Sequence, residues 1–317
     1  MKVHEPVPRF PARPPLVGSK PVILSFDIEE HYRIEAAAHL STSPDYRRHC
    51  RERMDLSTRR LLDQLAEHEV RSTFFVVGQI AQENPSLVRA IASAGHEVAS
   101  HGWDHQRIHN FTPETFREDI RRSKDALEEV TGRPVLGYRA PTFSVVRKTA
   151  WALDVLAEEG MVYDSSVYPV RHDRYGVPDA PRSPFLARGT ERTILEIPPV
   201  TLRVFGMNVP MGGGGYFRLF PLFVTDCAIQ QTLSDTAPPV AMLYFHPWEF
   251  DTEQEPLPLG RLSRFRTYVG IGRTQSRLST LLGRYRFARA IDVAERLDRD
   301  QLPTVDLSPS PRPVNLN

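Results

Sequence analysis

Two histidines four residues apart stand out as candidates for metal binding. They are His101 and His105, within the sequence His-Gly-Trp-Asp-His. Neutral imidazole is a favoured ligand of zinc, and residues at this spacing can point the same way across one turn of chain. His105 and His109 have the same spacing, so the histidines alone leave two pairs open. We prefer His101 with His105, because His101 directly follows a predicted strand.

A charged ligand is available in the acidic run Asp27-Ile28-Glu29-Glu30, which follows the first predicted strand. In an extended chain, residues two apart point to the same side. Glu29 can therefore reach an ion while Asp27 stands beside it, and Glu30 is a second candidate. Alone, this run would be read as a loop cap with solvated carboxylates. Taken together with the histidine pair and the motifs described below, the run favours a metal site instead.

Two further polar residues end predicted strands. Arg139 begins the sequence Arg-Ala-Pro-Thr-Phe, and an arginine there can hold a carboxylate by two hydrogen bonds, with a surface salt bridge as the alternative. His246 follows the apolar run 240–245, and a histidine so placed can serve as a general acid. Its alternative is a core histidine bonded to a backbone carbonyl.

Short apolar runs alternate with amphipathic ones from about residue 20 to 301, a pattern typical of parallel strands covered by helices. We expect strands at 21–26, 72–77, 97–100, 135–138, 162–164, 194–200 and 240–245. The candidate residues all follow strands, at the edge of a parallel barrel where chemistry is done. About seven strand-helix repeats predict an α/β fold with a distorted or open barrel.

Four motifs occur in a characteristic order: Ser25-Phe26-Asp27, His101 to His105, Arg139 to Phe143, and Leu243 to His246. In these motifs, over about residues 21–249, the chain resembles the polysaccharide deacetylase family, the nodulation-type carbohydrate esterases. Further stretches, 213–218 and 246–249 among them, look like the subgroup found in exopolysaccharide gene clusters. The family usually has two adjacent aspartates in its first motif, whereas this chain has Ile28 at the second position. The resemblance therefore carries the metal role to Glu29, with Glu30 as a possible substitute.

The resemblance implies a distorted (β/α)7 barrel that binds one divalent ion, with zinc expected, and removes the N-acyl group of an amino sugar. It assigns the proton transfers to Asp27 as general base and His246 as general acid. It also implies that Arg139 holds Asp27 and that Asp164 orients His246.

The remaining implied site residues would contact the substrate. Thr142 stands where the family often has tyrosine, and its backbone N–H would stabilise the oxyanion. Three aromatic side chains are candidate sugar-stacking surfaces, with core packing as the alternative: Phe143, Tyr216 and Trp248.

Two other functions remain open on the same residues. One is hydrolysis of a small amide or formamide, such as a cyclic ureide or a formamido sugar on a lipid. The other is a carbohydrate-binding relic without activity, against which the complete set of polar groups argues. Separate assays of acetate and formate distinguish the two hydrolytic reactions.

The amino-acid composition limits the classes of binding partner that we expect. With 40 basic and 39 acidic residues the net charge is +1, which does not favour a nucleic-acid partner attracted by bulk charge. The two cysteines, Cys50 and Cys227, are expected to be buried, unpaired thiols. We expect residues 1–19 to form a proline-rich tail, 20–301 the barrel with a helical extension, and 302–317 a loose tail.

No stretch reaches the length of a membrane span or an export signal, so we expect a cytoplasmic protein. The substrate would then be a lipid-linked or nucleotide-linked precursor. The sequence does not indicate the oligomeric state.

Overall fold

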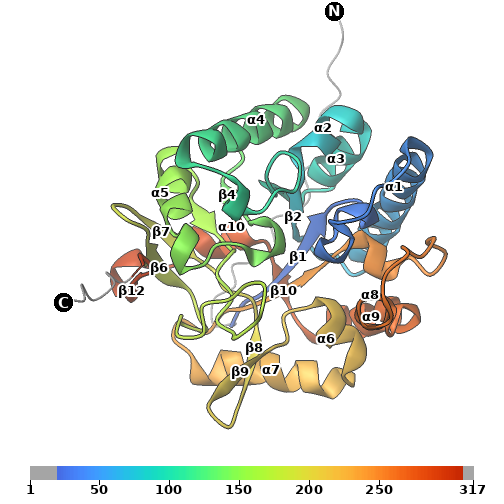
Figure 1. Ribbon diagram of the computed structural model, residues 1–317. Coiled ribbons are helices and arrows are strands. Elements are labelled where there is room, and N and C mark those ends of the chain that lie inside the picture. Colours follow the sequence, from blue (N-terminus) through green and yellow to red (C-terminus); the bar gives the residue numbers. More distant parts are fainter. Residues whose placement is uncertain (1–19, 310–317) are drawn as a thin grey trace, which may run out of the picture.

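The computed structural model describes residues 20–309, so the expected tail at 1–19 and the last residues, 310–317, lie outside the described residues. A parallel sheet occupies the centre and helices surround it (Figure 1). Seven strands pair in parallel in the order β10-β1-β2-β3-β4-β5-β7 within the described chain. In that order their bounds are Ala241–Phe245, Val22–Ile28, Thr73–Val76, Glu97–Ser100, Gly137–Tyr138, Tyr163–Asp164 and Thr193–Glu196.

The two ends of this run, β7 and β10, are joined by irregular hydrogen bonds rather than by a ladder. The N–H of Val200 donates to the carbonyl oxygen of Met242 (2.9 Å), and the N–H of Tyr244 donates to that of Gly212 (2.8 Å). The segment after β7 therefore fills the gap beside β10. The architecture is the distorted (β/α)7 barrel that the sequence predicts.

Helices connect successive strands and cover the outside of the barrel. They are α1 Pro44–Glu67, α2 Gly78–Glu83, α3 Pro85–Ser93, α4 Pro113–Thr131, α5 Trp151–Glu158 and α7 Leu222–Asp235. The bounds of α4 follow from its sequence, because Thr112 caps its first turn and Gly132 adopts the left-handed conformation (φ 64°). The helix α1 begins after Ser43, whose side chain accepts a hydrogen bond from the N–H of Tyr46 as its N-cap.

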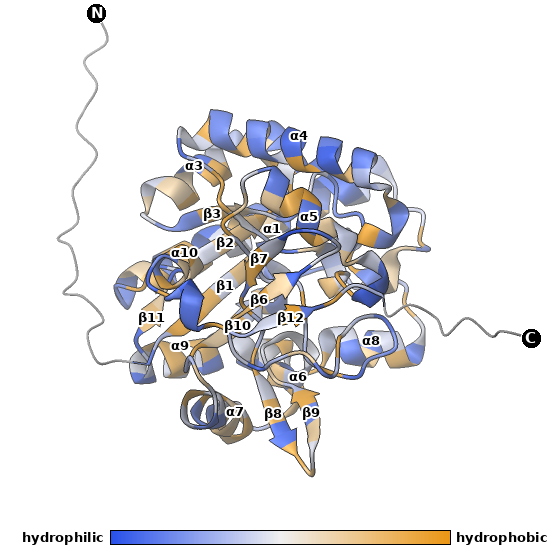
Figure 2. Ribbon diagram, turned by 90° about the vertical axis from the view of Figure 1, so that its left-hand side faces the viewer, coloured by the Kyte–Doolittle hydropathy of each residue, from blue (hydrophilic) through white to orange (hydrophobic). Residues whose placement is uncertain are grey.

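The core lies between the strands and these helices (Figure 2). Every residue of β1, β2 and β10 is buried, because helices and barrel interior cover both faces of each strand. The ring of Phe26 lies 5.1 Å from that of Phe74 and 6.2 Å from that of Phe245. Neighbouring strands are thus held in fixed register, and the polar residues that follow them have defined positions.

The second half of the chain adds elements that the sequence did not predict. A hairpin of β8 (Thr201–Val204) and β9 (Met207–Pro210) forms a separate sheet. The strand β6 (Phe185–Arg188) pairs antiparallel with β7, and β12 (Thr304–Asp306) pairs with β6. Part of the expected loose tail is therefore a strand, anchored by the buried Leu307. The strand β12 has only three residues and lies next to prolines, so the sequence shows no periodic pattern there.

The expected helical extension is present and packs on the outside of the barrel. It comprises α8 Arg261–Tyr268, α9 Thr274–Arg284 and α10 Ala290–Ala294, with β11 Phe287–Ala288 paired to β1, and the short α6 Gly214–Leu219 precedes α7. Cys50 is buried as expected, but Cys227 on α7 is exposed. Among the described helices, none is both long and apolar enough to cross a bilayer.

Candidate active site

Three predicted metal ligands meet at the carboxyl edge of the barrel. Glu29 follows β1, His101 follows β3, and His105 lies four residues further on. One ligand atom from each lies within 4.8 Å of the other two, and Nε2 of His105 contacts Oε2 of Glu29. Nδ1 of His101 lies 2.8 Å from the carbonyl oxygen of Arg139. Since a carbonyl oxygen only accepts, this nitrogen carries the proton and Nε2 is free to bind an ion.

The protonation states of these residues fit a divalent ion. Oε2 of Glu29 is buried against Nε2 of His105, so two atoms that can bind the same cation lie in contact with each other. Burial opposes ionisation of Glu29, but His105 and its neighbours hold the pKa of this carboxyl well below its ordinary value. Burial lowers the pKa of His101 to about 4. One ionised carboxylate and neutral imidazole form a donor set that suits zinc.

The alternatives that the sequence left open lie elsewhere. Glu30 is buried, and its Oε2 accepts a hydrogen bond from Nε of Arg33 (2.5 Å). His109 is exposed, in the short helix Ile108–Asn110. Among the described residues, neither Glu30 nor His109 belongs to the cluster of metal ligands.

Asp27 and Arg139 form a buried ion pair beside the cluster. Nη1 of Arg139 donates to Oδ1 of Asp27 (2.6 Å) and to the Ser25 hydroxyl (2.9 Å). The other edge of the guanidinium donates to Ser165, from Nε to its carbonyl oxygen (3.2 Å) and from Nη2 to its hydroxyl (2.9 Å). The predicted grip by two parallel bonds is therefore wrong, because Ser165 occupies half of the fork. Arg139 is fully buried, which excludes a surface salt bridge.

His246 faces both carboxylates. Its Nε2 lies 3.8 Å from Oδ2 of Asp27 and 3.7 Å from Oε1 of Glu29. Its Nδ1 lies 2.8 Å from Oε1 of Glu249, whose Oε2 accepts a hydrogen bond from Nε of Arg218 (2.8 Å). Burial alone would lower the pKa of His246, but the hydrogen bond to Glu249 and the adjacent carboxylates raise it to about 9. The hydrogen bond to Glu249 therefore favours the protonated form of this imidazole.

Glu249, rather than Asp164, orients His246. Sequence reasoning missed it, although the three-residue spacing in His-Pro-Trp-Glu was a usable signal: a short helix, Pro247–Phe250, brings the carboxylate back to the imidazole. In the described structure Asp164 has a different neighbour, because the register of β5 and β7 places it opposite Glu196. The predicted role of Asp164 is thus wrong.

Asp164 and Glu196 form a buried carboxyl pair. Burial raises the pKa of Asp164 to about 6 and that of Glu196 well above its ordinary value. Two adjacent buried carboxyl groups of this kind share a proton. Oδ1 of Asp164 accepts from the Ser166 hydroxyl (2.5 Å), whose oxygen accepts from the N–H of Ala140 (2.7 Å). The pair therefore supports the segment that follows Arg139.

That segment has unusual backbone conformations. Thr142 and Phe143 adopt positive φ angles of 58° and 51°, and His105 adopts 66°. Such angles are uncommon outside glycine, above all for a β-branched residue, and they persist where surrounding contacts enforce them. The strained positions lie beside the metal cluster and at the residue predicted to stabilise the oxyanion. They are consistent with a site that is held in place before substrate binds.

The three candidate stacking residues differ in exposure. Trp248 is buried and stacks with the rings of His31 (5.3 Å) and His246 (5.2 Å). Phe143 is buried in an aromatic cluster. Core packing is therefore the role of these two, whereas Tyr216 is only partly buried.

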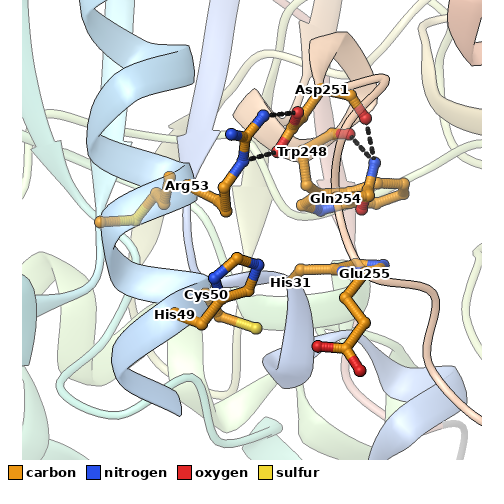
Figure 3. Close-up of a pocket in the computed structure, with 9 residues that line it drawn as sticks. His31, His49, Cys50, Arg53, Trp248, Asp251, Gln254 and Glu255 are labelled. Atoms are coloured by element: carbon orange, nitrogen blue, oxygen red, sulfur yellow. Dashed lines mark hydrogen bonds and ion pairs between the residues drawn. The ribbon is translucent and has the colours of Figure 1, made fainter. Parts of the chain in front are cut away.

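A small pocket lies behind Trp248 (Figure 3). Arg53 of α1 pairs with Asp251 there, and Gln254 donates to the backbone oxygen of Trp248 (2.6 Å). These bonds fix the segment that carries Glu249.

A wider, open groove of about 670 Å³ lies beside the metal ligands, and its polar lining includes Tyr32, Arg33, Arg47 and Asp104. Arg33 donates to the backbone oxygen of Asp104 (2.9 Å), next to His105.

Two family models match the chain. Residues 45–162 match the model described as polysaccharide deacetylase, and residues 165–295 match a domain of unknown function, DUF3473. A chitooligosaccharide deacetylase of Rhizobium leguminosarum bv. trifolii is 35% identical over 100 residues, which cover 32% of this chain and 44% of that protein. The chain spans less than half the length of the curated relatives it matches.

Two solved structures share the fold over nearly the whole chain. A putative polysaccharide deacetylase from Mycobacterium smegmatis has a TM-score of 0.58 at 23% identity, covering 96% of this chain and 99% of that one. The allantoinase Puue has a TM-score of 0.59 at 18% identity, covering 93% and 97%. These two structures show the fold, and the family match together with the motif order shows that residues 45–162, which carry His101, His105 and Arg139, belong to the polysaccharide deacetylase family.

Proposed function

We propose that this protein removes the N-acetyl group from an amino sugar of a polysaccharide or its precursor, as a metal-dependent hydrolase. The observation that carries the proposal is the position of His246, whose Nε2 lies 3.8 Å from Oδ2 of Asp27 and next to the cluster of metal ligands. Amide hydrolysis requires a base for the attacking water and an acid for the departing amine, and both are present. The names of the relatives supply the class of substrate.

Each residue has a role that follows from its contacts. Glu29, His101 and His105 would hold a divalent ion, which supplies Lewis acidity and lowers the pKa of water. Oδ1 of Asp27 is held by Arg139, so Oδ2 is the oxygen available to take a proton from water. Nε2 of His246 would deliver a proton to the amine, while Glu249 keeps the ring oriented.

Thr142 would contribute its backbone N–H to the developing oxyanion. We further propose a substrate carried on a lipid or nucleotide in the cytoplasm, in exopolysaccharide synthesis. This part rests on two expectations from the sequence. The stretches 213–218 and 246–249 resemble the exopolysaccharide subgroup, and the protein is expected to be cytoplasmic.

The test is release of acetate from N-acetylated chitooligosaccharides by purified protein, with formate measured in parallel. We expect acetate alone, lost after chelation and restored by added zinc. The Asp27→Asn variant should lose about 10²-fold or more in turnover, whereas the matched surface variant His109→Ala should not. Formate release alone would support the formamide reaction. Absence of both products with metal-loaded protein, on this and on lipid-linked substrates, would reject the proposal.

A further inference from the structure

Exposed apolar side chains are concentrated in one part of the chain. Within residues 20–309, seven of the eight large exposed hydrophobic side chains lie between residues 204 and 265. They form two groups: the hairpin tip, with Val204, Phe205 and Met207, and the helices α6 to α8, with Leu219, Phe223, Leu262 and Phe265. This part falls within the domain of unknown function. Exposed apolar groups gathered in this way mark surfaces that contact something else.

The helix α8 combines apolar and basic side chains. Leu262 and Phe265 are 63% and 53% exposed, and their three-residue spacing places them on one face. Arg261, Arg264 and Arg266 are exposed around them. The wider segment 256–291 has eight arginines and no aspartate or glutamate, although the whole chain has a net charge of only +1.

The charge on α8 is not neutralised within the described structure. Arg261, Arg264 and Arg266 form no ion pair with any described carboxylate, whereas Arg284 and Arg289 of the same segment pair with Asp226 and Asp292. The guanidinium of Arg264 lies over the Tyr268 ring, at 5.9 Å. The α8 face therefore presents positive charge to the solvent.

The helix is attached to the rim of the candidate active site. The hydroxyl of Tyr268, its last residue, lies 3.3 Å from Nε2 of His31. Arg218 of α6 links the two regions, since it donates to the carbonyl oxygen of Thr267 (2.6 Å) and to Glu249. In Figure 1, α6, α8 and α9 group together on the side of the barrel away from α4.

We propose that the α8 face, with Leu262, Phe265 and the three arginines, docks on an anionic phospholipid surface. Apolar side chains would enter the headgroup region while the guanidinium groups contact phosphates, as in interfacial amphipathic helices. A second copy of the chain is disfavoured, because two arginine-rich faces would repel each other. The hairpin fits less well, since residues 201–210 include a single arginine. Docking would place the catalytic residues close to lipid headgroups, a consequence that rests on the proposed function.

The test is co-sedimentation of the purified protein with vesicles of phosphatidylcholine alone or mixed equally with phosphatidylglycerol. We expect binding only to the anionic vesicles, weakened by salt. Reversal of two charges, in Arg261→Glu/Arg264→Glu, should weaken binding at least about 25-fold, because each arginine near an anionic surface contributes roughly fivefold. Leu262→Ser/Phe265→Ser should weaken it about tenfold, since apolar burial is lost.

Two matched controls locate the surface. Arg60→Glu/Arg133→Glu reverses the same charge at exposed positions elsewhere, and Phe205→Ser/Met207→Ser removes two more exposed apolar groups from the hairpin. Both should bind like the wild type.

Failure to bind anionic vesicles, or equal losses in the α8 variants and the controls, would overturn the proposal. The proposal would also be overturned if the apolar variant bound vesicles like the wild type and the protein bound soluble polyphosphate as tightly as anionic vesicles. Any polyanion would then suffice. Acetate release from soluble substrate and metal content should stay normal in every variant, so this test can fail without touching the proposed function.

Discussion

The interaction of His246 with Glu249 leads to a prediction about the pH dependence of turnover. In the Glu249→Gln variant the imidazole keeps a hydrogen-bonding neighbour but loses the ionised acceptor whose hydrogen bond most strongly raises its pKa. At a pKa of about 9, roughly nine-tenths of His246 is protonated at pH 8. If the pKa returned to the ordinary value of about 6.5, only about 3% would be protonated, so turnover would fall by up to about 30-fold at pH 8.

The same variant should remain active in mild acid, which separates the electrostatic role from a structural one. At pH 6 most of the imidazole is protonated in both proteins, so turnover should differ by less than about twofold. The assay is kcat across pH 5 to 9.5, with metal content and melting temperature measured alongside. Glu253→Gln, an exposed carboxylate nearby, is the matched control. A loss of turnover that is equal at every pH would refute the reasoning.

Three other perturbations follow from the site geometry. His101→Ala should abolish binding of a divalent ion, whereas His109→Ala should leave it intact; elemental analysis decides, and equal metal content would remove His101 from the ligand set. Arg139→Lys keeps the charge but loses the bonds to the loop after β5, so turnover should fall by ~10²-fold at normal metal content; near-normal turnover would show that charge alone suffices. Because the pKa of Asp164 is raised, the folded state holds its proton to higher pH, and the contribution of Asp164 to the free energy of unfolding should drop by about 2 kcal/mol as pH rises from 4 to 7. Asp164→Asn should show a smaller drop in urea unfolding at the two pH values, and an unchanged drop would exclude Asp164 as its source.

Much of the fold was predictable because its signals are local. The helix α4 has its capping threonine and terminal glycine, and the buried strands appear as continuous apolar runs. Parallel strands also end at one edge of the barrel, so the polar residues that follow them are expected to lie together. The hairpin β8–β9 and the strand β12 were missed, because short strands of mixed composition have no clear periodicity.

The choice among chemically similar side chains depended on contacts between distant segments. Glu29 and Glu30 are adjacent in sequence, yet one faces His105 and the other Arg33. Asp164 has the expected residue type, but it lies opposite Glu196 of β7. His246 follows a different strand, β10.

The sequence by itself determined the barrel class, the strand-end positions and the kinds of groups present, because these follow from local periodicity and residue type. Only the tertiary structure decided which of these groups touch. The partner of His246 is Glu249, and Arg139 divides its hydrogen bonds between Asp27 and Ser165. Such pairings depend on the register and tilt of strands that are far apart in the chain, and a shift of one residue would turn each side chain to the opposite face of its strand.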